Sequence, residues 1–415
     1  MAWRWPWQER KAITAADLHL DLIREAAARS GVRVTHETVL QASTALACAR
    51  VIAEGIAQVP LKLHRKLAGG GSEPAVDHPW YEPLHAAVNP FTTSYEWRET
   101  AGLHLAVMNR AYAYITRVDV VRSAVRELLP LTPQQVRTEQ GADSRTRYFV
   151  RFGEAAEQEV APERILHLRG PSWNSWEGLD GVKLAREAIG LALAAEEHGA
   201  RLFSNGAAVG GVLTTDQRLT KDQAADIRAA WDAVQTGLKH AYKTAVLWGG
   251  LKWSPRAQQN DQAQWIELRR FQVQEVCRFF RVLPIMVGEA DKTATYASSE
   301  QMFLAHVVHT LGPWYARIEQ RLNLQLLTRE EREAGLFFRF NVAGLLRGSH
   351  QDRANFYSKA LGAGGSPAWM TQDEIRGLED LNPKGGAAAV LPIPTNVGGG
   401  TPRGDENGPT DPQPA

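Results

Sequence analysis

The sequence predicts an α+β protein in which a β-rich region is followed by a run of long helices. Two observations lead to this fold class. Between residues 60 and 170, short apolar segments alternate with polar residues at the two-residue period of strands. From Gly181 the period becomes helical, with long amphipathic segments at 182–203, 263–283 and 299–327. A chain of 415 residues is long enough for two or three structural units.

The chain is expected to begin with an arm and a helix over 1–29, because Thr14 followed by Asp17 resembles a helix start. A second helix is expected at 43–58, ending before Pro60. The remaining elements of the first half are, in order, a strand at 61–66, a glycine turn at 69–71, a helix at 94–109, and strands at 111–120, within 128–140, at 148–152 and at 165–170.

The second half is predicted to be mostly helical. Thr220 is expected to cap a helix over 220–236, and Pro313 to kink the helix at 299–327. The other elements are a strand pair near 245–253, a polar loop at 286–298, a strand at 336–342, and helices at 350–361 and 371–380. Residues 385–415 are rich in Gly and Pro and lack aromatic residues, so disorder is expected there.

Composition argues against several classes of function. Lys+Arg 47 against Asp+Glu 46 gives a net charge of +1, which disfavours a tight clamp on phosphates. Cys48 and Cys277 have no CxxC neighbour and are interpreted as small buried residues. No segment is apolar enough to predict a membrane span.

No motif predicts a catalytic site, a cofactor or a metal. The Gly-rich segment 203–213 lacks the Gly-Lys-Ser/Thr of a phosphate loop and is interpreted as a turn. His306 and His309 have i,i+3 spacing, but no acidic or Cys partner is near in sequence. There is no GxSxG or HExxH, although catalytic residues can be distant in sequence.

Six segments resemble, in order, the portal protein family of tailed bacteriophages. They are FSNGAAVGGVL (203–213), AVLWGGLKW (245–253), FFRVLPIMVG (279–288), ATYASSEQ (294–301), FNVAGLLRG (340–348) and MTQDEIRGLEDLNP (370–383). Four positions depart from the family pattern: Val209 and Leu283 replace proline, Arg281 replaces glycine, and Ala343 replaces an acid. The resemblance runs from about Val39 to Pro383, and the order of the segments makes it specific.

The resemblance implies a portal-type subunit with a β-rich wing, a helical stem, a small clip and a helical crown, assembling into a ring usually of twelve. The implied regions are a wing at 30–219 with 328–349, stem helices at 220–236 and 263–285, a clip at 237–262, a tunnel loop at 286–298, a long tunnel helix at 299–327 and a crown at 350–384.

Two sets of residues are implied to carry function. The tunnel-loop residues expected to meet DNA are Glu289, Asp291, Lys292, Thr293 and Tyr296. The clip residues expected to dock protein partners are Lys239, His240, Lys243, Trp248, Lys252, Trp253 and Arg256. The alternatives are a plain surface loop at 286–298, and packing of Trp248 and Trp253 within a small sheet. Aromatic and basic residues together would also suit single-stranded nucleic acid.

The function implied is that of a non-enzymatic portal at one capsid vertex of a virion, assembled in the host cytoplasm. It would serve DNA packaging, retention and ejection. Its partners would be double-stranded DNA, the terminase motor, a head–tail adaptor and the major capsid protein, with no membrane. The alternatives are a DNA-processing enzyme, either an ATPase or a nuclease, and a structural adaptor that never surrounds DNA.

Overall fold

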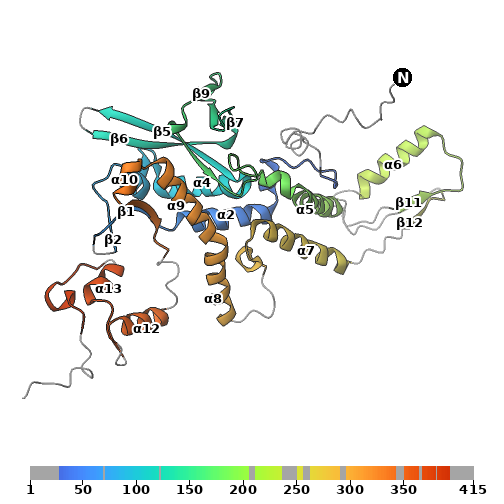
Figure 1. The fold of residues 1–415 in the computed structure, drawn as a ribbon. Helices are drawn as coiled ribbons and strands as arrows, with labels where there is room; N and C mark the ends of the chain where they lie inside the picture. The colour runs from blue at the N-terminus through green and yellow to red at the C-terminus, as the bar shows by residue number, and fades with distance from the viewer. Residues whose placement is uncertain are drawn as a thin grey trace, which may run out of the picture. The chain divides into compact units, whose positions relative to one another are not determined.

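The structure is a computed structural model that describes residues 28–68, 71–120, 123–204, 211–235, 250–255, 262–289, 296–342, 350–363, 367–379 and 381–392. The chain divides into two compact units, Met1–Asn341 and Val342–Ala415. Helices and strands are mixed as predicted, with small sheets in the first unit (Figure 1). The predicted N-terminal arm and all but the last two residues of its helix lie outside the described residues.

Two helices form the centre of the first unit. They are α2 (Ser43–Ala57) and α4 (Ser94–Met108), close to the predicted bounds. Thr93 begins α4 with a capping box to Glu96. The helices approach closely because the contact is made by small residues: a Cβ added to Gly102 would lie 2.8 Å from the Ala53 Cα. The backbones of α2 and α4 are therefore close together at this point.

A buried arginine joins the ends of two helices to this centre. The Arg98 guanidinium donates to the Ala57 carbonyl at the end of α2 and to the Leu84 carbonyl in α3 (Tyr81–His85). Helices leave their last carbonyls unpaired, so a guanidinium there replaces lost backbone hydrogen bonds. Burial lowers the pKa of Arg98 to about 10.

A three-stranded sheet joins the two ends of the first unit. Its order is β13 (Leu336–Phe340), β1 (Leu61–Lys66) and β2 (Ser72–Pro74). Leu61 pairs with Phe340 and Leu63 with Phe338, and all four side chains are buried. The strands predicted at 61–66 and 336–342 are therefore neighbours in one sheet.

Two further sheets share an apolar core. One has the order β10 (Ile165–Arg169), β5 (Arg110–Val120), β6 (Ser123–Leu131), and the other the order β7 (Val136–Gln140), β8 (Thr146–Val150), β9 (Gln158–Val160). The predicted strand segment 128–140 is divided between these sheets. Its first part belongs to β6 and its last part to β7, and a turn of 3₁₀-helix (η2) at Pro133–Gln135 separates the two. Tyr112, Leu131, Val136, Tyr148, Val150, Val160 and Ile165 form the core between them.

The long helix predicted at 299–327 is three consecutive segments. They are α8 (Tyr296–Ala305), a π-helical turn η6 (His306–Leu311) and α9 (Gly312–Gln325), continuous in Figure 1. Pro313 lacks the N–H that an α-helix interior needs, and the chain widens to the π form immediately before it. The proline expected to disturb this helix does so through the π turn.

Side chains of α9 cover the free edge of β10. The Gln325 amide accepts from the His167 N–H and donates to the Ile165 carbonyl, and Arg321 Nε donates to the His167 carbonyl at 2.9 Å. An edge strand otherwise presents unpaired backbone groups. Shorter elements complete the first unit: η1 (Thr38–Gln41), β3 (Ala87–Asn89), β4 (Thr92–Thr93), η3 (Pro162–Arg164) and α10 (Arg329–Glu333).

The second unit contains α12 (His350–Ala360), α13 (Gln372–Leu378) and a short 3₁₀ turn, η7 (Gly386–Ala389). The backbone N–H groups of Lys384 and Gly385 donate to the two Asp373 carboxylate oxygens, each at 2.8 Å. The prediction of disorder from Gly385 onward is therefore wrong up to residue 392, because these contacts hold the chain against α13. Residues 393–415 lie outside the described residues.

Candidate functional site

The segment predicted as a tunnel loop lies between two helices. α7 (Gln262–Phe280) leads into it through a 3₁₀ turn, η5 (Pro284–Val287), and α8 begins at Tyr296. The loop boundaries at 286–298 are thus wrong at both ends, since Met286 belongs to η5 and Tyr296 to a helix. Asp291, Lys292 and Thr293 lie outside the described residues.

The end of α7 has a backbone conformation that usually requires glycine. Arg281 has φ +56°, in the left-handed region, and the Val282 N–H donates to the Cys277 carbonyl at 3.0 Å. This is the Schellman closure of a helix, in which glycine is the usual residue. Thr310 Oγ1 donates to the Arg281 carbonyl at 2.6 Å, which fixes the π turn against the end of α7.

The acidic residue at the start of the loop is paired within the chain. Glu289 Oε1 lies 3.7 Å from Arg270 Nε on α7, and the Glu289 N–H donates to the Pro284 carbonyl. A partly exposed ion pair of this kind stabilises by about 0–1 kcal/mol. Glu289, one of the residues expected to meet DNA, therefore has a charged partner on α7.

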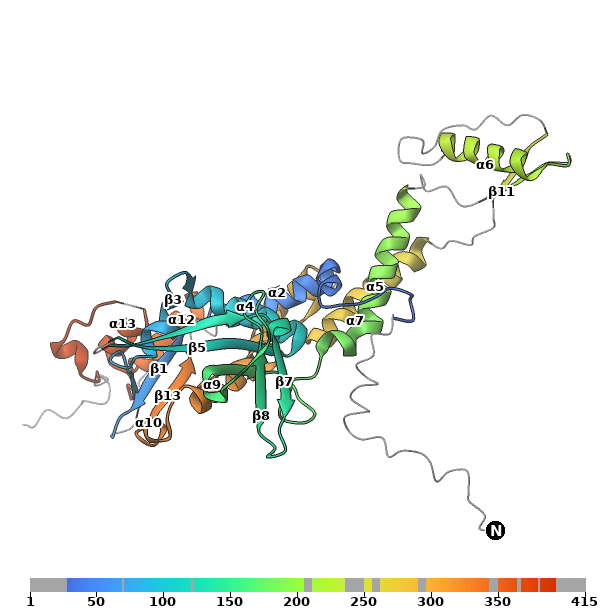
Figure 2. The ribbon, with the colours of Figure 1, turned by 90° about the horizontal axis from the view of Figure 1, so that it is seen from above.

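Large apolar side chains are exposed on both helices that flank the loop. On α7, Ile266 and Phe271 are 52% and 50% exposed, although Val276 and Phe280 of the same helix are buried. On α8, Phe303 and Leu304 are 42% and 49% exposed. The buried face of α7 packs against α5 (Gly181–Ser204), which runs beside it in Figure 2.

The predicted clip falls mostly outside the described residues. Lys239, His240, Lys243, Trp248 and Arg256 are outside. The described part is β12 (Lys252–Pro255), which pairs with β11 (Gly211–Thr214). A strand pair was predicted near 245–253; of that range the structure describes 250–253, where β12 begins at Lys252. The partner of β12 comes from the Gly-rich segment interpreted as a turn. Pairing requires two extended segments, and valine and leucine at 212–213 favour that form.

The two described clip side chains are accessible. Lys252 is exposed, and its Nζ lies 3.6 Å from the Asp216 carboxylate. Trp253 is 40% exposed and lies opposite Leu213. α6 (Lys221–Gln235) follows β11, and Thr220 caps it as predicted, accepting from the Gln223 N–H. β12, which is paired with β11, therefore exposes one basic residue, Lys252, and one aromatic residue, Trp253.

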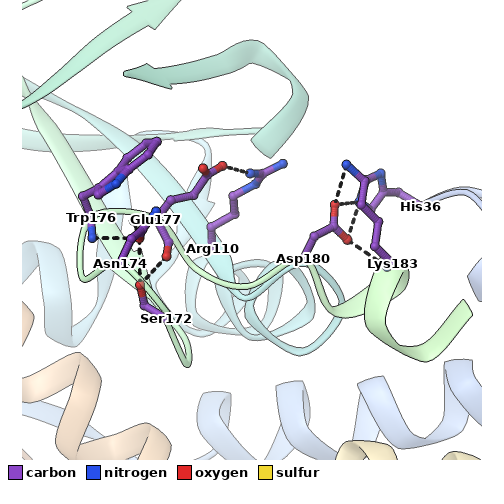
Figure 3. Close-up of polar contacts among 8 residues, drawn as sticks. All are labelled: His36, Arg110, Ser172, Asn174, Trp176, Glu177, Asp180 and Lys183. Carbon is purple, nitrogen blue, oxygen red and sulfur yellow. Dashed lines mark hydrogen bonds and ion pairs between the residues drawn. The ribbon is translucent and has the colours of Figure 1, made fainter. Parts of the chain in front are cut away.

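Sequence reasoning missed a tightly built loop at 171–180, drawn in Figure 3. Asn174 Oδ1 accepts from the N–H groups of Trp176 and Glu177, and Ser172 Oγ accepts from the Ser175 N–H. Trp173, at the tip, is 92% exposed. The signal available in sequence was a Ser and Asn pair between glycines 170 and 178, which favours side-chain-stabilised turns.

Three salt bridges secure that loop at its end (Figure 3). Arg110 pairs with Glu177, and Asp180 lies 3.2 Å from His36 Nε2 and 3.7 Å from Lys183 Nζ. Burial alone would raise the pKa of Asp180, but the hydrogen bond and charge of His36 and the contacts with Lys183 outweigh it and lower the pKa to about 2. Asp180 is therefore ionised at neutral pH.

Cys48 and Cys277 are both buried, as interpreted from the sequence, and they are neighbours. Their Sγ atoms are 3.7 Å apart, between α2 and α7. Within the described ranges, no group of three or more His, Cys, Asp or Glu residues is arranged to hold a metal ion. His306 is buried on the π turn, where burial lowers its pKa. None of the described helices combines the length and apolar character that crossing a membrane requires.

Comparisons with known proteins identify the class to which this fold belongs. The crystal structure of an HK97-family phage portal protein from Corynebacterium diphtheriae matches with a TM-score of 0.57 and 17% identity, over 75% of this chain and 96% of that one. The neck of a native gene transfer agent particle, computed with C12 symmetry, matches with a TM-score of 0.55 and 18% identity, over 88% and 99%. At such identities the likeness shows the portal fold.

Sequence comparison carries the assignment further. The family model described as phage portal protein matches residues 43–380. The probable portal protein of Streptomyces phage phiC31 is 29% identical over 396 residues, covering 90% of this chain and 82% of that relative. This chain belongs to the phage portal protein family, and the predicted family and fold class are confirmed.

Proposed function

We propose that copies of this protein form a closed ring of twelve at one vertex of a phage or phage-like capsid, and that DNA passes through its centre. Membership of the portal family supports the channel role. The number twelve is supported by the C12 symmetry with which the matching gene transfer agent neck was computed. The protein would act without enzymatic activity of its own, in a virion assembled in the host cytoplasm.

The observation that carries this proposal is the apolar surface of α7 and α8. Phe271 on one helix and Phe303 on the other are about half exposed, together with Ile266 and Leu304. Exposed apolar groups on helix faces can be buried by contact with another subunit. A cyclic ring needs two different, complementary faces on each subunit, and packing of helix faces between neighbouring copies would remove these side chains from water.

Each region of the subunit would have the role that the family resemblance implies for it. The clip, with Lys252 and Trp253 on β12, would dock the terminase motor during packaging and the head–tail adaptor afterwards. The loop between α7 and α8 would lie in the channel, where small side chains and a single cation permit sliding. The wing would contact the major capsid protein.

The test is assembly of the purified protein, measured by mass photometry and by negative-stain images. We expect rings with a central hole in the parent protein. Phe271→Asp with Phe303→Asp should leave only folded monomer, because both side chains are exposed within one copy. Val76→Asp, at an exposed apolar residue elsewhere, is the control. Monomer alone at high concentration, with and without capsid protein, would contradict the ring, and ATP hydrolysis by the pure protein would favour an enzyme.

A further inference from the structure

A recess lined by arginines lies beside the covered edge of β10. Its volume is about 280 Å³, and it is bounded by Arg169 and Ser175 on one side and by a stripe of α9 on the other. The α9 stripe consists of Arg317, Gln320, Arg321 and Leu324, whose i, i+3, i+4, i+7 spacing places them on one face. Three guanidinium groups therefore line one small space.

Among the residues that the structure describes, no carboxylate balances these arginines. No ion pair to Arg169, Arg317 or Arg321 occurs among the residues that the structure describes, and no acidic residue lines the recess. Burial lowers the pKa of Arg321, and the charge of Arg169 lowers it further. Partly buried like charges repel one another, so an anion in this space would stabilise the subunit.

Two of the three guanidinium groups, those of Arg169 and Arg321, are held in place by contacts with backbone carbonyls. Arg321 Nε donates to the His167 carbonyl, and Arg169 donates to the Ser175 carbonyl in the loop drawn in Figure 3. Each contact uses only part of the donor fork, so further N–H groups remain for a ligand. Fixed arginine forks match the paired oxygens of a carboxylate.

The rim of the recess favours a protein ligand over DNA. Leu324 is 58% exposed at the lining, and Trp173, on the loop that supplies Ser172 and Ser175, is 92% exposed. Arginine, tryptophan and apolar residues together are typical of protein–protein interfaces. Contacts with duplex DNA would instead call for a basic excess, which a chain of net charge +1 lacks.

We infer that Arg169, Arg317 and Arg321 form a receptor for an Asp or Glu side chain of the neighbouring copy in the ring. The inference rests on the proposed ring, in which every copy has a head-to-tail neighbour. The incoming carboxylate would accept hydrogen bonds from the arginines while Leu324 packs against its surroundings. The same charge-assisted hydrogen bonds between a carboxylate and these arginines would then recur at every subunit interface of the ring.

Two variants, each with its own control, test the assignment by ring assembly and by thermal unfolding of the subunit. Arg317→Glu should raise the subunit concentration needed for assembly on the order of tenfold, and Arg329→Glu, at an exposed arginine paired with Glu333, should not. Gln320→Glu should place a carboxylate inside the recess. It should raise the unfolding temperature of the subunit and weaken assembly, because the internal carboxylate competes with the neighbour's. Gln58→Glu, at the exposed end of α2, is its control.

A photo-crosslinking residue at Leu324 identifies the occupant directly. In assembled rings we expect crosslinks to a peptide of a neighbouring copy that contains Asp or Glu. Crosslinks to packaged DNA, or only within one copy, would overturn the assignment, as would normal assembly of Arg317→Glu and Gln320→Glu. If the parent protein forms no ring, the ring proposal itself fails, and this receptor fails with it.

Discussion

At the scale of single residues, Arg281 shows how a departure from the family pattern is accommodated. The sequence showed only that arginine stands where the family has glycine. The structure shows that this position closes α7 in the left-handed region, at φ +56°. An L-residue there costs roughly 1–2 kcal/mol relative to its preferred conformation. The chain therefore has a backbone conformation that favours glycine at a position occupied by arginine.

Arg281→Gly should therefore stabilise the protein by about 1 kcal/mol, because glycine adopts this conformation without steric cost. The gain is reduced by the greater freedom of glycine in the unfolded chain. The measurement is the urea concentration at which half of the subunit is unfolded, compared between variants whose unfolding free energy depends equally on urea concentration. Arg278→Gly, three residues earlier inside the helix, should destabilise it. A lower midpoint for Arg281→Gly would show that its side chain contributes more than its backbone conformation costs.

A second residue predicts how stability depends on pH. Burial on α4 lowers the pKa of His104 from 6.5 to about 4. Between these values the unfolded chain binds the proton and the folded chain does not. This contribution to stability is therefore complete above about pH 6.5 and is lost as the pH falls toward 4. The loss is on the order of 3 kcal/mol at most.

His104→Gln should consequently flatten the pH dependence of the free energy of unfolding between pH 6.5 and 4. The comparison is the denaturant midpoint of variant and parent at half-unit intervals. His198→Gln, at an exposed position of α5, should leave the profile unchanged. An unaltered slope in His104→Gln would mean that other groups account for the acid sensitivity.

At the scale of elements, sequence periodicity located most helices and strands but not their partners. Alternation at 61–66 and 336–342 predicted two strands, and β1 and β13 are hydrogen-bonded to each other. The local pattern of a strand does not show which distant strand will form hydrogen bonds with it. For the same reason β11 was missed, since four residues beside glycines do not signal a strand until β12 is placed next to them.

The candidate site was predictable only as far as the family resemblance reached. That resemblance indicated a helix–loop–helix at 263–327, and the structure has one. The Glu289–Arg270 pair, the adjacent sulfurs of Cys48 and Cys277 and the arginine recess all join residues from separate elements. Such juxtapositions follow from packing, which no single segment encodes.

The close crossing of α2 and α4 makes a prediction about helix packing. Gly102→Ala should destabilise the protein by about 1–3 kcal/mol, since the added Cβ would meet the α2 backbone at Ala53. Gly377→Ala in α13 has open space around it and should be neutral or stabilising by up to about 1 kcal/mol. Thermal unfolding of both variants measures the two changes in stability. If Gly102→Ala and Gly377→Ala changed stability equally, α2 and α4 would be able to move apart without loss of stability.

At the scale of the whole molecule, function depends on what the assembled ring does to DNA. Residues 286–298 contain a single Lys or Arg residue, Lys292. Each subunit can therefore make about one phosphate contact there, which adds roughly one unit to the salt dependence of binding. Such contacts would guide DNA without stopping it.

Deletion of Asp291–Thr295 should leave ring assembly intact and reduce the retention of packaged DNA. Assembly is measured by mass photometry, and retention by nuclease-protected DNA in filled particles over time. Replacing the same five residues by a Gly/Ser segment of equal length controls for loop length. Full-length DNA retained at the parental level in the deletion variant would leave the loop without a role in the channel.

The pairing of β1 with β13 has a consequence for synthesis of the chain. A ribosome releases β1 and its neighbour β2 early, yet the second hydrogen-bonding partner of β1 follows only at Leu336–Phe340. Until then Leu61 and Leu63 lack the strand that covers their edge, and contacts this distant in sequence form slowly. A nascent chain shorter than about 340 residues therefore cannot close its first sheet. Newly made subunits would depend on chaperones during that interval, and no copy could join a partner before its own translation is nearly complete.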